Sequence, residues 1–414
     1  MNIAQLLVRA ARVFPHRVAI ARGFASHATY GELARRAAAI AHTFTSALRL
    51  QPGDRVVLYL PNCPEYLEVL AGIWWAGLTA VPVNAALQGQ QLTTLLEDSQ
   101  AALCFTAAGG VQASVAAIGE ARTIDIASSR YQQIARSVGE ASIAWNVPDD
   151  LAWLFYTGGT TAQPKGVMLS HRNLLAMTLC YFADVDAIGA ETCMIHTAPM
   201  SHGSGLYALP HFTAASTQVI PESGAFDPAE VRALATHWRN ATMLADPTMI
   251  RQFVAALRVT QPDIAQLKTI VCGGPLNHPD AQEARSVLGP RLVQIYGPAE
   301  CPMTVTALSR FNLNDTKHPR YHARIASVGV PQSAVEVRIV DHEDRLSPPG
   351  QAGEIVVRGE PAMRGYWMNA RATAKALKGG WLHTGDTGVF DADGFLTLVG
   401  PEETTGSGQD TYPR

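Results

Sequence analysis

Short apolar runs that alternate with helical patterns constrain the fold of this chain more than any other feature. Residues 56–60 and 80–83 are apolar and β-rich, and a helical pattern that begins near Pro64 lies between them. An alanine-rich helix begins at Thr29, and Glu32 stands at the spacing of a capping box. Strands that alternate with helices favour a parallel-leaning sheet that is covered on both faces. We therefore predict an α/β body in which mixed sheets pack against helices.

The pattern changes in the last quarter of the chain. Residues 335–340 and 353–359 are short runs of alternating side chains, which predict a small and mostly antiparallel β-subdomain. We therefore divide the chain into a large body at 1–326, with two subdomains, and a β-subdomain at 327–400. Residues 106–150 are small, polar and weakly periodic, so we expect a surface connection there.

The composition describes a protein with a large core and balanced charge. Hydrophobic residues make up 47% of the 414 residues and charged residues 16%, which favours a sizeable core over disorder. Lys and Arg total 32 against 35 for Asp and Glu, so the net charge is −3. Because no basic stripe stands out, we expect no nucleic-acid partner.

The cysteines and the N-terminus indicate a cellular location. The 6 cysteines stand singly, without Cys-x-x-Cys spacing, which is typical of reduced thiols and argues against a zinc site or a disulfide frame. The first residues lack the basic-then-apolar plan of a signal peptide. The longest uncharged apolar stretch, 70–83, is short of a membrane span and contains Pro82. We therefore expect a cytoplasmic protein with no transmembrane segment.

A loop rich in glycine and threonine carries the strongest chemical signal. Residues 156–166 read Tyr-Thr-Gly-Gly-Thr-Thr-Ala-Gln-Pro-Lys-Gly and follow an apolar run at 151–155. Glycines let a backbone point N–H groups at an anion, threonines add hydroxyl donors, and Lys165 adds a positive charge. A hairpin turn with a surface lysine is the alternative. The common P-loop pattern, Gly-x-x-x-x-Gly-Lys-Ser/Thr, does not occur here.

The whole pattern of this loop resembles the phosphate-binding signature of the adenylate-forming superfamily, which contains acyl-CoA synthetases, luciferases and the adenylation domains of peptide synthetases. Two positions depart from its usual form, because Gly158 replaces a serine and Ala162 replaces a glycine. The resemblance implies that Lys165 and Thr160 act in catalysis. It also implies that the phosphates of ATP are bound by Thr157, Gly158, Gly159, Thr160, Thr161 and Lys165.

A histidine after a predicted strand is a candidate for the acyl site. His202 lies in a Gly/Ser loop that follows the run at 194–198, and ligand crevices of open α/β sheets lie at the carboxyl ends of strands. A lone histidine is more often packed or solvated. The match of Pro199-x-x-His202 to a superfamily element implies that His202 and Gly203 border the acyl pocket, so we include His202 among the catalytic residues.

Three further motifs follow in the order that the superfamily has. By resemblance, Gly273-Gly274-Pro275 lies against adenine, although Gly-Gly alone fits any strand-to-helix turn. The resemblance implies that Tyr296 and Gly297 belong to a turn that contacts the purine, and that Glu300 is a catalytic residue that ligates Mg²⁺. The residue before this glutamate is usually a threonine, but here it is Ala299. Asp386, in Trp-Leu-His-Thr-Gly-Asp, is implied to bind the ribose hydroxyls, whereas a single aspartate out of context is usually solvated.

The resemblance covers about residues 1–400 and implies the fold of the superfamily's N-terminal domain. Residues 401–414 lack the usual hinge motif. We therefore expect an atypical tail and no C-terminal domain, which in the superfamily carries the lysine needed for adenylation.

The resemblance implies an ATP-dependent carboxylate–CoA ligase that forms acyl-AMP and then acyl-CoA, with Mg²⁺ as cofactor and coenzyme A as co-substrate. A fatty or other apolar acid is the expected small-molecule substrate, because no aspartate for an α-amine stands between His202 and Ile220. The altered tail suggests an alternative, a non-catalytic protein that binds nucleotide or acyl-adenylate. An adenylation domain that loads a carrier protein is less favoured, since no carrier module follows.

Overall fold

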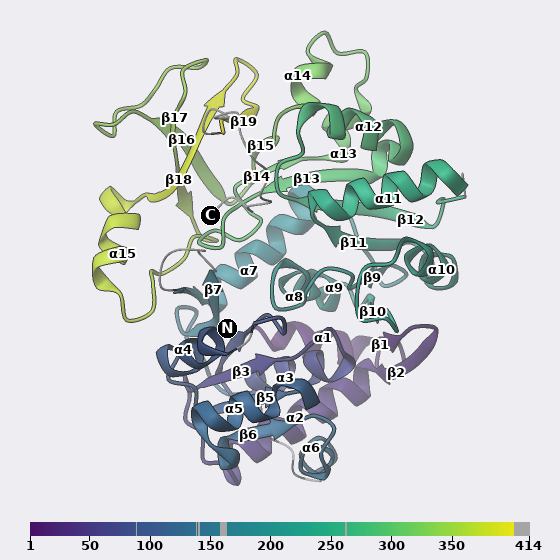
Figure 1. The fold of residues 1–414 in the computed structure, drawn as a ribbon, viewed down its shortest axis with the longest axis vertical. Helices are drawn as coiled ribbons and strands as arrows, with labels where there is room; N and C mark the ends of the chain where they lie inside the picture. Colours follow the sequence, from purple (N-terminus) through teal and green to yellow (C-terminus); the bar gives the residue numbers. More distant parts are fainter. Residues whose placement is uncertain (88, 138, 140, 158–163, 261–262, 401–414) are drawn as a thin grey trace.

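The computed structural model describes residues 1–414 except 88, 138, 140, 158–163, 261–262 and 401–414 (Figure 1). The described residues form mixed sheets packed against helices, together with a small antiparallel sheet. The predicted α/β fold is therefore confirmed. The proposed division at residue 327 stays a prediction.

The first sheet, in the lower part of Figure 1, holds the strands of the early alternating pattern. Its strands are β3 (Arg55–Tyr59), β4 (Thr79–Pro82), β5 (Leu103–Thr106), β6 (Thr123–Asp125), β7 (Leu151–Thr157) and β8 (Lys165–Ser170). Their order is β6-β5-β3-β4-β7-β8, and the pairs are parallel except for the antiparallel pair of β7 and β8. The glycine-rich stretch thus connects two strands of a hairpin.

The second sheet has a parallel centre and antiparallel edges. Its strands are β1 (Val18–Arg22), β2 (Ala25–Thr29), β9 (Cys193–Ile195), β10 (Thr217–Ile220), β11 (Ala241–Ala245), β12 (Leu267–Gly273), β13 (Leu292–Tyr296), β14 (Thr306–Leu308) and β15 (Val330–Pro331). Their order is β15-β14-β13-β12-β11-β9-β10-β1-β2. Because β9, β11, β12 and β13 are mutually parallel, the loops that follow them emerge at one edge.

The third sheet, at the upper left of Figure 1, is the antiparallel one that the sequence predicts after residue 327. Its strands are β16 (Val335–Val340), β17 (Gly353–Gly359), β18 (Leu382–Phe390) and β19 (Leu396–Leu398), paired in that order. The amide of Val328 donates to the carbonyl of Leu396 at 2.8 Å, which ties this sheet to the chain just before β15 of the second sheet.

Helices fill the space between the sheets and cover their outer faces. They are α1 (Gln5–Val13), α2 (Tyr30–Ser46), α3 (Pro64–Trp75), α4 (Gln90–Asp98), α5 (Val111–Ile118), α6 (Ser129–Ala135), α7 (His171–Cys180), α8 (Gly203–Leu206), α9 (Ala208–Thr213), α10 (Pro228–Trp238), α11 (Pro247–Thr260), α12 (His278–Leu288), α13 (Arg310–Asn314), α14 (Tyr321–Ile325) and α15 (Ala370–Ala376). Single turns are η1 (Ala108–Gly110), η2 (Glu120–Arg122), the π-helical η3 (Tyr181–Val185), η4 (Gly289–Arg291) and η5 (Lys378–Gly380).

Strand β3 shows how the helices cover the first sheet. Val56 and Leu58 belong to the main core with α2 and α3, whereas Val57 belongs to a second core with α4 and α5. This split follows from the alternation of side chains along a strand. Helix α2 also contacts β1 and β2, so it lies between the two large sheets. The predicted capping box of Thr29 and Glu32 is present at its start.

The expectation of a surface connection at 106–150 is wrong. This stretch forms α5, β6 and α6, and β6 pairs in parallel with β5 at the edge of the first sheet. Ile118, Tyr131 and Ile134 are buried. The elements are too short to show a clear hydrophobic period, and their burial comes from packing against α2 and α4.

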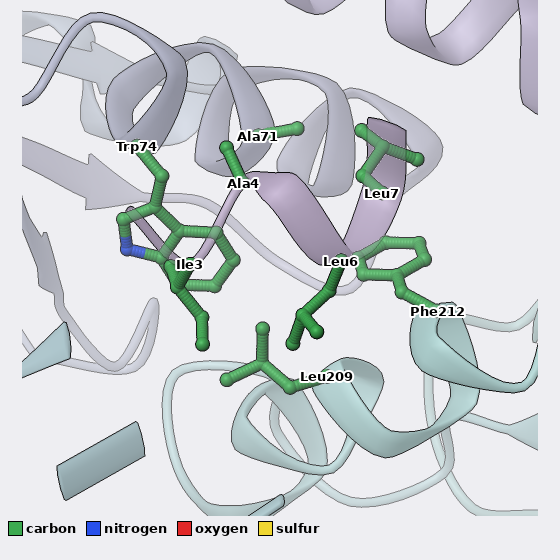
Figure 2. Close-up of a pocket in the computed structure, with 8 residues that line it drawn as sticks. All are labelled: Ile3, Ala4, Leu6, Leu7, Ala71, Trp74, Leu209 and Phe212. Carbon is green, nitrogen blue, oxygen red and sulfur yellow. The ribbon is translucent and has the colours of Figure 1, made fainter. Parts of the chain in front are cut away.

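A small apolar cavity lies between α1, α3 and α9 (Figure 2). It measures about 10 Å³ and is lined by Ile3, Ala4, Leu6, Leu7, Ala71, Trp74, Leu209 and Phe212. The indole N–H of Trp74 is already bonded to the carbonyl of Ala152 at 2.8 Å. With no free polar group to hold a ligand or a water, this cavity is a packing void between helices.

All six cysteines are free thiols in the described part of the chain, and five of them are buried. Across that same part, no helix combines the length and the apolar character needed to cross a bilayer.

A buried carboxylate joins elements that are far apart in the sequence. Glu68, in α3, has a side chain that is 3% exposed and pairs with Arg36 of α2 and with His27 of β2, the latter at 2.7 Å. It also accepts a hydrogen bond from the hydroxyl of Tyr131 in α6 at 2.7 Å. Burial raises the pKa of Glu68, but His27, Arg36 and Tyr131 together outweigh burial and hold this pKa below its usual value.

Replacing this carboxylate should destabilise the fold. The substitution Glu68→Gln leaves Arg36 without its anionic partner, so we expect a loss of about 3 kcal/mol in the free energy of unfolding. Urea unfolding followed by circular dichroism measures it. The matched control is Glu97→Gln, at an exposed position of α4, which should change the same quantity by less than about 0.5 kcal/mol. Equal stability of the two variants would contradict the role of Glu68.

Three buried histidines make the fold sensitive to acid. Burial lowers the pKa of His171 and of His196 to about 4, and that of His211 to about 3. His196 bonds Ser204 and Gln218, and each of these contacts is within 2.8 Å. These histidines therefore stay neutral in the folded protein when an unfolded chain would already bind protons.

Stability should fall as the pH drops from 6.5 towards 4. Below pH 6.5 the unfolded state takes up protons that the folded state does not, so each neutral histidine costs about 2 kcal/mol of stability between pH 7 and pH 5. Urea unfolding over this pH range measures the slope. His196→Gln should flatten it, whereas His342→Gln, at an exposed position, should not. An unchanged slope in His196→Gln would refute the assignment.

Candidate active site

The predicted phosphate loop lies in the hairpin of β7 and β8. Four predicted phosphate-binding residues, Gly158, Gly159, Thr160 and Thr161, lie outside the described residues. The backbone of Thr157 ends β7 and pairs with Lys165, which begins β8. The side chain of Lys165 is exposed. Lys165 therefore lies at the end of the hairpin where β7 ends and β8 begins.

Residues 363–367, which we call the connecting segment, join this hairpin to the second sheet. The amide of Trp367 donates to the carbonyl of Gly166 in β8 at 2.7 Å. At the other end, the amide of Met363 donates to the carbonyl of Glu300 at 2.7 Å. One short piece of backbone therefore sets the separation between the lysine strand and the predicted metal ligand.

Tyr366, in the connecting segment, contacts both predicted groups. Its hydroxyl donates to Oε1 of Glu300 at 2.6 Å, and Nζ of Lys165 lies 5.2 Å from the centre of its ring. The second contact is within the range of a cation–π interaction, worth about 0.5–1 kcal/mol at exposed sites. Burial and the adjacent Glu300 raise the pKa of Tyr366, so its hydroxyl keeps its proton and donates.

Tyr366 is not among the site residues predicted from the sequence. The run Met-Arg-Gly-Tyr-Trp at 363–367 contains a glycine followed by two aromatic residues, which is the one local signal that could have singled it out. Gly365 has a φ of +136°, and a Cβ there would lie 2.5 Å from Cγ2 of Thr373. The glycine thus allows the turn that presents Tyr366.

The predicted purine and ribose residues also meet. Tyr296 is the last residue of β13, and its hydroxyl donates to Oδ2 of Asp386 in β18 at 2.6 Å. Burial raises the pKa of Asp386, the bond from Tyr296 lowers it, and the negative charge of Glu354 raises it, with a net upward shift. This pair joins the second and third sheets beside the loop that holds Glu300.

The predicted glycine turns follow β12 and β13. Gly273 ends β12, Gly274 has a φ of +112°, and Pro275 is exposed. After β13, a Cβ on Gly297 would lie 2.5 Å from the carbonyl oxygen of Cys301, so a larger residue would push this loop apart. Both turns allow a close approach of backbone at the carboxyl ends of neighbouring strands.

His202 lies beside an aromatic and apolar surface. The ring of His202 stands edge-on to Phe155 at 5.6 Å between ring centres, and its Nδ1 lies 3.0 Å from Oγ of Ser201. Burial lowers the pKa of this ring. A Cβ on the next residue, Gly203, would lie 2.7 Å from Leu244 and 2.9 Å from the sulfur of Met303. The small residue therefore leaves room for apolar side chains to close around this loop.

The structure brings most of the predicted residues to one region. Tyr296 ends β13, and Glu300 lies in the loop that follows this strand. The Tyr296–Asp386 hydrogen bond is therefore close in the chain to Glu300, which bonds to Tyr366, and Tyr366 in turn contacts Lys165. The glycine turns and His202 follow neighbouring parallel strands. Polar groups from all three sheets thus meet at the carboxyl edge of the second sheet, where an open α/β sheet binds ligands.

The described residues contain no group of three or more His, Cys, Asp or Glu side chains that could hold a metal ion by themselves. Mg²⁺ usually takes one or two carboxylates together with substrate phosphates. The single carboxylate of Glu300 fits that kind of site, because it is partly exposed and only its Oε1 accepts from Tyr366.

The chain is similar to known proteins over most of its length. The family model described as AMP-binding enzyme matches residues 7–367. A feruloyl-CoA synthase from an Amycolatopsis species is 32% identical over 410 residues, covering 98% of this chain and 80% of the relative. A long-chain-fatty-acid–CoA ligase from Escherichia coli is 28% identical, covering 90% of this chain and 72% of the relative.

Solved structures have the same fold. The crystal structure of VinN has a TM-score of 0.84 and 25% identity, covering 97% of this chain and 99% of VinN. The structure of o-succinylbenzoate coenzyme A synthetase from Bacillus subtilis in complex with AMP has a TM-score of 0.83 and 25% identity, covering 95% and 77% of the two chains. Because the family model spans most of the chain and a relative is 32% identical across it, this protein belongs to the AMP-binding enzyme family of the adenylate-forming superfamily, which includes the acyl-CoA synthetases.

Proposed function

We propose that this protein is an ATP-dependent carboxylate–CoA ligase. A carboxylate oxygen attacks the α-phosphorus of ATP, the bond to the β-phosphate breaks, and acyl-AMP and pyrophosphate form. The thiol sulfur of coenzyme A then attacks the acyl carbon, loses its proton and displaces AMP. This chemistry needs no nucleophile from the protein, whose work is to position the reactants and neutralise charge.

The predicted residues divide this work by their chemistry. Lys165, with the threonines of the phosphate loop, would hold the β- and γ-phosphates. Glu300 would hold Mg²⁺, which supplies positive charge between phosphate oxygens. Tyr296 and the turn at Gly273 and Gly274 would contact the adenine, while the carboxylate of Asp386 would accept hydrogen bonds from the ribose hydroxyls.

One observation carries this proposal. Lys165, Glu300 and Asp386 lie far apart in the sequence, yet the tyrosine contacts at 2.6 Å and 5.2 Å place them around one loop after β13. A cation, a metal-binding carboxylate and a ribose-binding carboxylate are the groups that a nucleoside triphosphate requires. An ordinary hairpin lysine or a solvated aspartate would not need these partners.

The surroundings of His202 favour an apolar acid. Phe155, Leu244 and Met303 lie against His202 and Gly203, and none of them carries a charge that would bind a second polar group on the substrate. Two relatives are named for feruloyl and long-chain fatty acyl substrates, both of which have an uncharged body. We therefore propose a fatty or other apolar acid without an amine.

A second candidate is a protein that binds nucleotide without turnover. Ala299 favours it, because the usual threonine at this position would donate a hydroxyl to the α-phosphate and alanine cannot. Binding of the nucleotide would survive this loss more readily than stabilisation of the transition state.

Pyrophosphate release distinguishes the two candidates. The 414-residue chain is incubated with MgATP and a panel of short, medium, long-chain and aryl carboxylic acids. We expect more pyrophosphate release with acid than in the blank that contains no acid, and the strongest release with apolar acids. We also expect the acyl-adenylate to be trapped as a hydroxamate. Tight binding of a non-hydrolysable acyl-adenylate analogue without release would favour the second candidate, and the absence of both would refute a nucleotide site.

Replacing the ribose carboxylate should weaken nucleotide binding. Asp386→Asn keeps the acceptor for Tyr296 but loses the charge, so we expect the Kd for AMP to rise about tenfold. Isothermal titration calorimetry measures this constant. Asp344→Asn is the matched control, since Asp344 is an exposed residue that pairs with Lys378 on the surface. An unchanged Kd in Asp386→Asn would remove the ribose role.

A further inference from the structure

We propose that Tyr366 is a positioning residue that aligns the metal-binding carboxylate of Glu300 with the ammonium group of Lys165. This inference rests on the proposed function and adds to it a residue that acts through its two neighbours. The hydroxyl and the ring of Tyr366 contact different charged groups.

The hydroxyl restrains the carboxylate. At 2.6 Å it donates to Oε1 of Glu300, and a carboxylate has a second oxygen with which it can ligate a metal ion. A metal ligand that is held by a hydrogen bond is already oriented before the ion arrives. The free side chain of a glutamate would instead have to lose its rotational freedom when the ion binds.

The ring fixes the position of the lysine. Nζ of Lys165 lies 5.2 Å from the ring centre, and Lys165 is an exposed residue at the start of β8. The face of an aromatic ring attracts a cation and limits where it moves. Because ring and hydroxyl belong to one side chain, the distance between the two charged groups is set by a rigid body.

The backbone holds Tyr366 itself in place. Its amide donates to Oγ1 of Thr373 at 2.9 Å, and it forms an isolated bridge with Val167 of β8. Three residues earlier, the amide of Met363 donates to the carbonyl of Glu300 and so attaches the connecting segment to the loop after β13. Tyr366 is therefore anchored to both elements whose side chains it contacts, which is the arrangement a positioning residue requires.

The test uses the Mg²⁺ dependence of nucleotide binding by the full chain. Isothermal titration calorimetry gives the Kd for ATP over a series of MgCl₂ concentrations and in EDTA, and the Kd for AMP without metal. In Tyr366→Phe, which keeps the ring and loses the hydroxyl, we expect the Mg²⁺ concentration for half-maximal tightening of ATP binding to rise about tenfold. The Kd for AMP should stay unchanged.

Two further variants make the result specific. Tyr131→Phe removes an equivalent bond, from a tyrosine hydroxyl to Glu68 at 2.7 Å, far from the site, and should leave the Mg²⁺ dependence as in the wild type. In a Glu300→Gln background, Tyr366→Phe should add no further shift, because the hydroxyl acts through the carboxylate.

Failure of the positioning role and failure of the proposed function would give different results. A wild-type Mg²⁺ dependence in Tyr366→Phe, or an equal further shift in the Glu300→Gln background, would overturn the role of Tyr366 and leave the proposed function standing. If the wild-type chain bound neither AMP nor ATP, the proposed function would be refuted, and the positioning role with it.

Discussion

The pairing of parallel strands is the constraint on which the rest of this structure depends. Strands β9, β11, β12 and β13 run side by side in one direction, so the loop that follows each of them emerges at the same edge. Those loops contain His202, the glycine turn at Gly273 and Gly274, and the segment from Tyr296 to Glu300. Residues that lie far apart in the sequence therefore meet at one edge of this sheet, and the helices that connect its strands shield both of its faces from water.

The other two sheets reach this edge through polar contacts of the chain that joins them. The connecting segment 363–367 bonds to β8 on one side and to the carbonyl of Glu300 on the other. The hydroxyl of Tyr296 bonds to Asp386 on the third sheet. Both tyrosine–carboxylate bonds are partly buried, where a hydrogen bond to a charged group is stronger than in water. The site is thus a place where three sheets are held together, and a nucleotide there would contact groups from each.

Several predictions made from local pattern agree with the fold, and the exceptions have a common cause. The capping box at Thr29 and the strands around residues 56–60 depend on neighbouring residues, so the sequence shows them. The elements at 106–150 are short, and their side chains are buried by other parts of the chain, so the local sequence shows no clear hydrophobic pattern for them. In the site, motifs pointed to Lys165, Glu300 and Asp386, but the roles of these residues stay predictions, and Tyr366 carried no comparable signal.

The sequence alone determined the alternation of strands and helices, the family and the residue types that a nucleotide site needs, because each is written in short stretches of neighbouring residues. Only the tertiary structure decided which polar groups meet. The bonds from Tyr366 to Glu300 and from Tyr296 to Asp386 join residues that are 66 and 90 positions apart. No local pattern specifies such a partner, because the partner is selected by the packing of whole sheets, which the pairing of their strands and the burial of their apolar faces determine.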